Sequence, residues 1–379
     1  MTDDRTKANP STKVDLERRR LLGAAGAGVV AATLGGAFTT PSTISAQPVK
    51  TLSWGIVGTG GIANSMAPRI REAEHAGLAA VSSRKMTTAK AFAGTHQIDH
   101  AFDSWADMLA FDGVDAVYIA TPTSVREEIA IAAAKAGKHV LGEKPFANLP
   151  SLKRITSACR DSGVGFMDGT HFVHHPRTLQ IKSEIAALIG RHDSLASAFQ
   201  FSLTDKTNIR LNPQLEPYGA IGDTGWYNMR AVVEYLPDDA EMVSADAYLR
   251  RDQDSGAVVA GSGILTFSDG TTSTFHCGFD SGGMVMDLRI AGSQGVIKMD
   301  DFLSQRRTDH AGVYRYGTGW GSSEEIEIPS TKTAATLMFE DFAVMTLDKA
   351  TFEASVRASE RTQRLLDAVW KSATKNESV

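Results

Sequence analysis

The sequence predicts an α/β protein in which a doubly wound parallel sheet is followed by an α+β domain with a mostly antiparallel open sheet. First, an apolar run at Leu52–Val57 leads directly into a glycine-rich turn and a helical pattern. Second, strand-like and helical patterns alternate as far as Met167, whereas hairpin-like patterns dominate after it. The composition agrees, because 42% of the 379 residues are hydrophobic and 22% are charged, as in ordinary globular proteins.

Residues 1–46 predict a signal peptide of the twin-arginine type. The basic run Glu17-Arg18-Arg19-Arg20 precedes a glycine-rich apolar run, Leu21–Phe38, and Ile44-Ser45-Ala46 offers a cleavage site. The alternative is an uncleaved anchor, but the apolar run is short for a spanning helix and glycines weaken it. The prediction is therefore periplasmic export of a folded protein, with no stable membrane insertion after signal removal.

The turn after the first strand has the spacing of a dinucleotide-binding fingerprint. Gly58 allows the tight turn, Gly60 lets the backbone approach a pyrophosphate, and Ala63 lets the helix pack close to the strand. The following helix N-terminus offers free N–H groups to the phosphates. A tight strand–helix turn without a ligand would show the same spacing. The predicted cofactor contacts here are Gly58, Thr59, Gly60, Gly61 and Ile62.

Alternating elements then extend this domain over residues 51–168. Further strands are predicted at Leu78–Val81, Ala116–Ile119, His139–Leu141 and Val164–Met167, with helices at Thr87–Ala93, Ser124–Ala136 and Leu149–Cys159. Residues 169–379 are predicted to form the α+β domain. Its hairpins are expected at Ile264–Cys277 and Leu288–Met299, and its helices at Thr178–Leu188, Asp223–Leu236 and Glu353–Lys371.

The end of the second strand favours NADP over NAD. An NAD site usually has an acidic residue there to bind the ribose hydroxyl. Here the strand ends in Ser82-Ser83-Arg84-Lys85, and hydroxyl groups followed by two cations suit a 2′-phosphate. Ser83, Arg84 and Lys85 are therefore predicted cofactor contacts. Arg84 and Lys85 could instead simply begin a solvated helix, and NAD stays open as the alternative.

Polar residues follow the fourth and fifth strands, where open parallel sheets bind ligands. Thr121 and Pro122 follow one strand, and Glu143 and Lys144 follow the next. All four are predicted cofactor contacts. The Lys144 ammonium could also bind a substrate oxygen and favour its alkoxide-like form, which makes it a catalytic candidate. The alternative is an ordinary surface lysine.

Together these segments resemble the glucose–fructose oxidoreductase, inositol dehydrogenase and MocA (Gfo/Idh/MocA) family over roughly residues 51–379. The resemblance implies a Rossmann domain, a second sheet domain that supports a homodimer or dimer of dimers, and hydride transfer between NAD(P) and a sugar or polyol. It also implies that Lys144 is catalytic. The chain departs from the family at Thr123 and Arg126, where Asn and His are frequent. The motifs that carry the resemblance are Gly58–Ala63, Ala120-Thr121-Pro122, Ala136–Val140 and Glu143-Lys144-Pro145.

Asp223 and Tyr227 are four residues apart, which places both on one helix face. They resemble the family's Asp-x-Gly-x-Tyr/His motif, which implies that Tyr227 exchanges the proton and that Asp223 orients the substrate. A nearby ammonium such as Lys144 is expected to lower the pKa of the Tyr227 phenol. The alternative is that Tyr227 is a core aromatic and Asp223 an N-cap residue. Lys144, Asp223 and Tyr227 are therefore predicted both to act in catalysis and to bind substrate.

His171 and Arg177 follow the last strand of the first domain and are predicted substrate contacts. A metal site is not predicted, because His171, His174 and His175 are not spaced to converge on one ion. The two cysteines are too few for a disulfide scaffold, and the net charge of −5 gives no reason to expect a nucleic-acid partner.

The leading functional hypothesis is an exported NADP-dependent oxidoreductase that acts on a sugar or sugar-like alcohol. Because no free nicotinamide pool is expected outside the cytoplasm, a tightly bound cofactor that travels with the folded protein is part of it. One alternative is redox-assisted glycoside cleavage with bound NAD. The other is a non-enzymatic ligand-sensing relative, although the presence of Lys144 and Tyr227 disfavours it.

Overall fold

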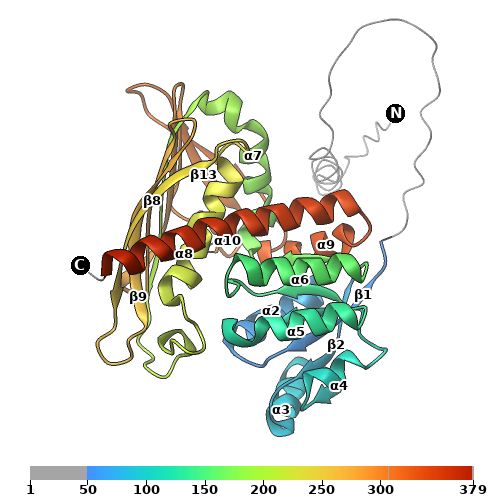
Figure 1. Cartoon of the computed structure of the whole chain (residues 1–379). Coiled ribbons are helices and arrows are strands. Elements are labelled where there is room, and N and C mark those ends of the chain that lie inside the picture. Colours follow the sequence, from blue (N-terminus) through green and yellow to red (C-terminus); the bar gives the residue numbers. More distant parts are fainter. Residues whose placement is uncertain (1–48, 306, 378–379) are drawn as a thin grey trace, which may run out of the picture.

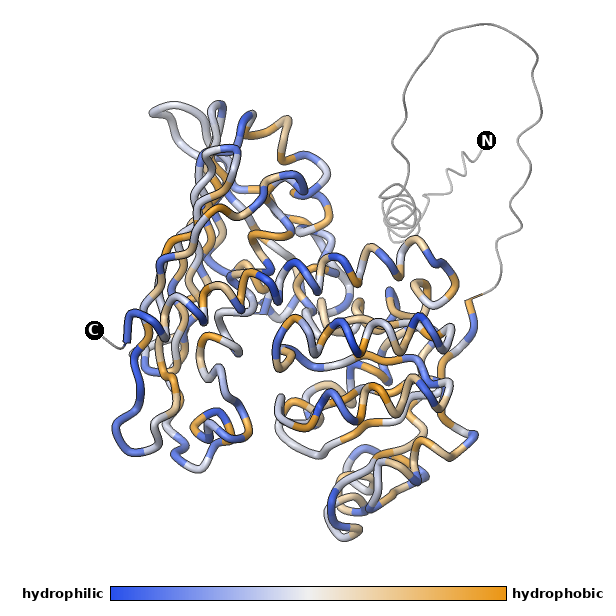
Figure 2. The backbone as a smooth tube through the Cα atoms, in the orientation of Figure 1, coloured by the Kyte–Doolittle hydropathy of each residue, from blue (hydrophilic) through white to orange (hydrophobic). Residues whose placement is uncertain are grey.

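The computed structural model describes residues 49–305 and 307–377, so the predicted signal peptide lies outside the described residues. Two sheets stand side by side, and the long C-terminal helix α10 (Lys349–Glu377) runs across both (Figure 1). Along α10, hydrophobic and hydrophilic residues alternate turn by turn (Figure 2), so that one face is buried. Within the described ranges no helix has the length and apolarity needed to cross a bilayer.

The first sheet has six parallel strands in the order β3-β2-β1-β4-β5-β6, as the alternating patterns predict. Helices cover its two faces, which is why its central strands are buried on both sides. The strands are β1 (Leu52–Val57), β2 (Ala76–Ser82), β3 (His100–Phe102), β4 (Ala116–Ile119), β5 (His139–Gly142) and β6 (Phe166–Asp168); the helices are α2 (Gly61–Glu72), α3 (Met86–His96), α4 (Trp105–Leu109), α5 (Thr123–Lys135) and α6 (Leu149–Asp161).

The second sheet has eight strands in the order β14-β13-β12-β11-β7-β10-β9-β8 and is antiparallel except for the β7–β10 pair. Both predicted hairpins are present as β9–β10 and β11–β12. The strands are β7 (His192–Ser202), β8 (Met242–Arg251), β9 (Val258–Phe267), β10 (Thr272–Gly278), β11 (Asp280–Gly292), β12 (Val296–Met299), β13 (Gly312–Gly317) and β14 (Glu324–Ile328); the helical elements are η1 (His171–His174), α7 (Pro176–Ile189), η2 (Ile209–Leu211) and α8 (Gly219–Tyr235).

Helix α9 (Ala334–Met345) comes from the second half of the chain but packs against the first sheet. Its Phe339 and Phe342 rings lie 5.1 and 4.9 Å from the Trp54 ring of β1, centroid to centroid, and Phe339 also contacts Tyr118 of β4. Aromatic groups of this size bury enough apolar surface to hold the two halves together. The core of the first sheet is therefore completed by the C-terminal part of the chain.

Candidate active site

The glycine turn after β1 contains two kinds of glycine. Gly58 has a φ of +103°, and a Cβ there would lie 2.9 Å from the Ala120 carbonyl oxygen, so the turn itself requires glycine. Gly60 and Gly61 begin α2, and a Cβ at either position would meet nothing within 4 Å. No protein atom therefore fills the space next to these two glycines. A ligand could approach the backbone at the N-terminus of α2 through this space.

The predicted 2′-phosphate contacts lie next to this turn. The hydroxyl oxygens of Thr59 and Ser83 are 3.1 Å apart, which joins the glycine turn to the end of β2. Arg84 and Lys85 follow and are exposed, immediately before α3. The sequence therefore places hydroxyl groups and cations, and no acid, where a ribose substituent would lie.

A cavity of about 400 Å³ opens from the turn toward the second sheet. Thr121 Oγ1 is buried beside it with no hydrogen-bond partner among the described residues, which leaves a polar atom for a ligand. Most of the predicted site residues meet here, although seven lie outside the lining: Gly58, Thr59, Ser83, Arg84, Lys85, Pro122 and Arg177. The predicted residues in the lining are Gly60, Gly61, Ile62, Thr121, Glu143, Lys144, His171, Asp223 and Tyr227.

Lys144 and Asp223 form a buried ion pair at the centre of the cavity. Lys144 Nζ donates to the Asp223 carboxylate and, at 3.1 Å, to its backbone carbonyl. Arg210 of η2 donates to the other carboxylate oxygen at 2.6 Å. Burial opposes the ionisation of Asp223, but Lys144 and Arg210 outweigh it and hold the pKa of this carboxyl well below its usual range. Asp223 is thus a fixed anion that keeps Lys144 in place.

Asp223 is not an N-cap residue, because α8 begins four residues earlier at Gly219. The helix can extend this far because its small residues allow close contacts. A Cβ at Gly219 would lie 2.3 Å from the Val258 carbonyl oxygen, and one at Gly222 would lie 2.9 Å from Pro145. Asp223 therefore points its carboxylate at Lys144, and Tyr227 follows on the same helix face, as their spacing predicts.

Glu143 supports the residue next to it. Its buried carboxylate accepts a hydrogen bond from the Tyr118 hydroxyl at 2.5 Å and from the Lys144 backbone N–H at 3.3 Å. Burial raises the pKa of Glu143, while Lys144 acts in the opposite direction. A Cβ at Gly169 would lie 2.8 Å from its Oε1, so η1 begins directly against this side chain.

Tyr227 is 7% exposed and lies beside Lys144, whose Nζ is 4.8 Å from the ring centroid. The expectation that Lys144 lowers the pKa of this phenol is wrong. Burial raises the pKa well above 10, and the charges of Glu143 and Asp223 add to the effect, because the Lys144 ammonium is already paired with Asp223. Tyr227 is therefore a neutral phenol at physiological pH.

His171 contacts the Tyr227 hydroxyl through Nε2 at 3.1 Å. It is 8% exposed, and burial together with the charges of Lys144 and His174 lowers its pKa to about 3, so the imidazole is neutral. Gln305, which was not predicted, places its amide nitrogen 2.9 Å from the same ring nitrogen. It lies in the loop between β12 and β13, whose path the sequence does not indicate.

The prediction that Arg177 contacts substrate is wrong. Its guanidinium is buried and donates to three backbone carbonyls, those of Asp301 at 2.8 Å, Phe302 at 2.5 Å and Val313 at 3.1 Å. Arg177 lies in the first turn of α7. Its planar guanidinium has several N–H donors and can bind these carbonyls at the same time. Its role is to hold this connection in place, outside the cavity.

Several lining residues were missed by the motifs. Arg126 was noted only as a departure from the family pattern, yet it donates to the carbonyls of Pro145 and Thr121. Glu216 accepts from the backbone N–H of Thr123 at 3.1 Å and from its hydroxyl at 2.6 Å, which joins α5 to the η2 loop. No local signal marks these contacts. The other missed lining residues include Phe199, Phe201, Asn208 and Arg210.

The three neighbouring histidines have different partners. His171 contacts Tyr227, His174 pairs with Asp341 at 2.7 Å, and His175 binds the His310 carbonyl at 2.8 Å. Across residues 49–305 and 307–377, no group of three or more His, Cys, Asp or Glu is arranged to hold a metal ion.

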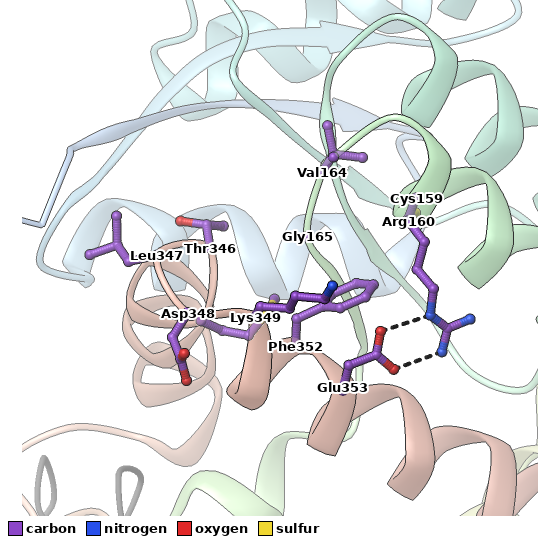
Figure 3. A pocket seen from close by; sticks show the side chains of 12 residues that line it. Cys159, Arg160, Val164, Gly165, Thr346, Leu347, Asp348, Lys349, Phe352 and Glu353 are labelled. Carbon is purple, nitrogen blue, oxygen red and sulfur yellow. Dashed lines mark hydrogen bonds and ion pairs between the residues drawn. The ribbon is translucent and has the colours of Figure 1, made fainter. Parts of the chain in front are cut away.

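A second cavity, of about 380 Å³, lies between α6 and the start of α10 (Figure 3). Arg160 and Glu353 face each other across its edge in a two-bond ion pair, with contacts of 2.8 and 2.9 Å. None of the predicted site residues lines it. The predicted catalytic residues Lys144, Asp223 and Tyr227 all line the first cavity and not this one.

Comparison with known proteins bears on the family and the fold of this chain. Residues 52–170 match a family model described as an oxidoreductase family with an NAD-binding Rossmann fold, and residues 184–298 match the GFO/IDH/MocA C-terminal domain. A D-xylose 1-dehydrogenase (NADP(+)) from Haloferax volcanii is 33% identical over 235 residues, which cover 61% of this chain and 70% of that protein. A scyllo-inositol 2-dehydrogenase (NADP(+)) from Bacillus subtilis is 29% identical and covers 78% and 88%.

Among solved structures, a 3-ketoreductase from Actinomadura kijaniata in complex with NADP and TDP-benzene is similar with a TM-score of 0.77. It is 26% identical, and the match covers 85% of this chain and 98% of that one. An aldose–aldose oxidoreductase from Caulobacter crescentus shares the fold, with a TM-score of 0.77 at 22% identity and coverage of 86% and 98%. The two matched models and these relatives show that the chain belongs to the Gfo/Idh/MocA family of oxidoreductases.

Proposed function

We propose that this protein is an exported NADP-dependent oxidoreductase that transfers a hydride between a sugar or sugar-like alcohol or carbonyl and a tightly bound nicotinamide cofactor. One observation carries the proposal: Lys144, Asp223 and Tyr227 converge on the same cavity that the open glycines Gly60 and Gly61 line. A sensor that only bound a ligand would not need an ammonium and a phenol at this position.

The residues present fit a dinucleotide of the NADP type. Gly60 and Gly61 leave open space at the N-terminus of α2, and the unpartnered Thr121 hydroxyl faces the cavity. Arg84 and Lys85 supply cations for a 2′-phosphate, and the named relatives include NADP-dependent dehydrogenases. The cofactor supplies hydride acceptance and donation, and the protein supplies positioning and proton transfer.

The side chains divide the remaining work. Lys144 Nζ, held by Asp223, donates a hydrogen bond to the reacting oxygen and stabilises the negative charge that develops on it. Tyr227, a neutral phenol, is the group that exchanges a proton with that oxygen. Asp223 orients Lys144, and Arg210 pairs with the second carboxylate oxygen of Asp223.

The cavity suits a neutral, unphosphorylated substrate. Among the described residues, the charged lining consists of three cations and three acids, and each is already hydrogen-bonded within the protein. The rings of Phe199 and Phe201 add an apolar wall against which a sugar ring can pack. We therefore expect D-xylose or scyllo-inositol to be oxidised with NADP⁺ in preference to a nucleotide-linked sugar, measured by NADPH formation. NADP⁺-dependent turnover of nucleotide-linked sugars alone would contradict this substrate class.

Export and a resident cofactor rest on the signal-like residues 1–46. The test is to express the full chain in a host with twin-arginine export, purify the mature protein from the periplasm and identify released nucleotide by mass spectrometry. Near-stoichiometric NADP(H) is expected. A protein found only in the cytoplasm would contradict export, and an empty periplasmic protein that turns over with added NADP⁺ would contradict the resident cofactor.

A homodimer, or a dimer of dimers, through the second sheet completes the proposal. The face of this sheet away from α8 carries exposed or half-exposed side chains on its central strands, including Ala196, Ala198, Thr274 and Arg289. Short side chains along β7 would let a second sheet approach closely. Sedimentation equilibrium is expected to give twice or four times the monomer mass, and a monomer at micromolar concentration would contradict the dimer.

Gly60→Val is expected to abolish NADP⁺ binding, with at least a hundredfold rise in Kd, and to leave the thermal midpoint of unfolding nearly unchanged. The new side chain has free space in the protein but occupies the path of a pyrophosphate. Isothermal titration with NADP⁺ and a thermal melt of the cofactor-free protein measure the two effects. The matched control is Gly58→Ala, which is expected to lower stability because of the positive φ and the Ala120 contact.

Arg84→Ala is expected to raise the Kd of NADP⁺ by roughly ten- to a hundredfold and to leave the Kd of NAD⁺ unchanged, because a charge-assisted pair with the 2′-phosphate contributes about 1.5–3 kcal/mol. Titration of the same protein with both nucleotides measures the ratio. Arg191→Ala, which removes another exposed arginine far from the turn, is the control. An equal rise in the Kd of NADP⁺ and of NAD⁺ would show that Arg84 does not bind the 2′-phosphate.

A further inference from the structure

The buried hydroxyl of Tyr227 has a polar neighbour behind it. His171 Nε2 lies 3.1 Å from this hydroxyl oxygen, and the Gln305 amide nitrogen lies 2.9 Å from the same Nε2. Tyr227 and His171 are both buried, whereas Gln305 is exposed. The three groups therefore form a continuous polar path from the cavity to the surface.

Neighbouring contacts hold the His171–Tyr227 pair in register. The residue before His171 is Thr170, and the residue before Tyr227 is Trp226; the Trp226 indole N–H donates to the Thr170 hydroxyl at 2.6 Å. Thr170 is fixed in turn by Asp168 at the end of β6. Two neighbouring contacts, Thr170–Trp226 and His171–Tyr227, thus join the start of η1 to α8. The His171 and Tyr227 rings are inclined at 49°, and their centroids are 5.5 Å apart.

The contacts at Nε2 favour the tautomer of His171 that carries its proton on Nδ1. An amide nitrogen can only donate, so the Gln305 amide requires His171 Nε2 to accept. In a neutral imidazole the proton then lies on Nδ1, and the single lone pair of Nε2 is shared between the Gln305 amide and the Tyr227 hydroxyl. This is the arrangement that a base behind a phenol needs.

We propose that His171 is the proton acceptor behind Tyr227, so that the substrate proton passes through the phenol to the imidazole. This step rests on the proposed function. In the oxidation direction the substrate O–H bond breaks and its proton moves to Tyr227 Oη, while the original phenol proton moves to His171 Nε2. The substrate C–H bond breaks, its electron pair leaves with the hydride to the nicotinamide, and a C=O bond forms.

This relay explains how a phenol of raised pKa can serve as a base, because the phenolate is never formed. The positive charge that appears on the imidazole replaces the positive charge that the hydride removes from the nicotinamide, so the charge of the enclosed site is conserved. When His171 is protonated, the exposed Gln305 side chain can turn its carbonyl oxygen toward Nε2 and accept from it. The proton then passes to water.

The charged and titratable groups around the pair come from several elements. Lys144, after β5, and His174, on η1, disfavour a charged His171. Glu143, Asp223 and Asp168 disfavour a phenolate at Tyr227, and Arg210 acts in the opposite direction. All of these remain in place in the variants below, so a change in pH dependence reports on His171.

The kinetic test uses His171→Gln, which retains a hydrogen-bonding amide but cannot take up a proton. For the purified holoprotein oxidising D-xylose, the wild type is expected to show a kcat that is independent of pH between about 6 and 8, because His171 is neutral there. The variant is expected to lose roughly 10²- to 10⁴-fold in kcat, with little change in KM, and its rate should rise with pH. His100→Gln, at an exposed position on β3 and outside the cavity, is the matched control and should keep the wild-type profile.

Chemical rescue separates a proton-transfer role from a structural one. Added imidazole is expected to restore turnover to His171→Ala, with a rate that depends on the pKa of the imidazole used, and Gln305→Glu is expected to move the acid limb of the wild-type profile to higher pH. Wild-type kcat and pH profile in His171→Gln would overturn the relay while leaving the proposed function intact. Absence of turnover in the wild type would instead count against the proposed function.

A measurement without turnover keeps the relay testable in that case. Nitrogen-15 NMR of the imidazole in the cofactor-free protein is expected to show a neutral ring with the proton on Nδ1 from pH 5 to 8, and Tyr227→Phe should shift the Nε2 resonance. A proton on Nε2 in the wild type, or a charged ring near pH 6, would overturn the proposal.

Discussion

Lys144→Ala is expected to lower kcat for NADP⁺-dependent sugar oxidation by roughly a thousandfold, which corresponds to about 4 kcal/mol of transition-state stabilisation. In the proposed mechanism the Lys144 ammonium, which Asp223 holds in the cavity, donates to the reacting oxygen. Its removal also leaves Asp223 with Arg210 as its remaining cationic partner, so a buried carboxylate loses half of its compensation. Because the lost interaction is made mainly in the transition state, KM should change less than kcat.

Steady-state kinetics with D-xylose, combined with NADP⁺ titration, test this expectation. NADP⁺ binding should survive, since the glycine turn and the Arg84 region are untouched. Lys153→Ala, at an exposed position on α6, removes a lysine of the same size and should behave as wild type. A Lys144→Ala enzyme that retains more than a tenth of the wild-type kcat would show that the hydride-transfer step does not depend on this ammonium.

Arg230→Met is expected to lower the free energy of unfolding by about 3–5 kcal/mol. Arg230 lies on α8 and pairs with Asp168 at 2.7 Å and Glu234 at 2.8 Å, and all three side chains are at most 7% exposed. Methionine fills much of the volume but leaves Asp168 without its cation. In this variant Glu234 still forms its ion pair with Lys182. Among the described residues, Asp168 still accepts hydrogen bonds from hydroxyl groups and a backbone N–H but has no cationic partner.

The pH dependence gives this prediction a second readout. Burial opposes the ionisation of both carboxylates. At Asp168 it is outweighed by Arg230 together with the Ser359 and Thr170 hydroxyls, which lower the pKa, and at Glu234 by Lys182 with Arg230, so that the pKa of Glu234 falls to about 2. A lowered folded-state pKa contributes stability above the unfolded pKa, near 4, and that stability is lost as the pH falls toward 2. The wild-type advantage over Arg230→Met should therefore shrink between pH 5 and pH 3.

Urea unfolding at both pH values measures the difference. Arg191→Met, which removes an arginine that is 76% exposed and paired with Asp193, is the control and should cost less than about 1 kcal/mol. A constant difference between wild type and Arg230→Met from pH 5 to pH 3 would mean that the loss comes from packing and not from the unpaired carboxylate.

Local patterns were sufficient to predict residues that the structure brings together around Lys144. The strand–glycine–helix order placed Gly60 and Gly61, the end of β5 placed Lys144, and a four-residue spacing placed Asp223 and Tyr227 on one helix face. Each of these is a relation between residues close in sequence, where backbone geometry alone determines direction.

Contacts between distant segments could not be predicted in the same way. Arg177 was expected in the cavity, but its direction depends on the carbonyls at Asp301 and Val313, more than a hundred residues away. The same holds for Arg210, whose loop is placed by contacts with the first domain such as Thr123–Glu216. The pKa of Tyr227 also depended on burial, which the sequence does not show, and on the prior pairing of Lys144 with Asp223.

The position of α9 has a consequence for how the chain is made. Trp54 emerges from the ribosome early, yet the helix that covers it, Ala334–Met345, is synthesised about 280 residues later. The nucleotide-binding half therefore cannot complete its core during translation, however early its strands pair. If the protein is exported folded, its signal peptide is synthesised first, but export must wait for the last eighth of the chain. Truncation before Ala334 should leave an incomplete first domain and a precursor that the export machinery rejects.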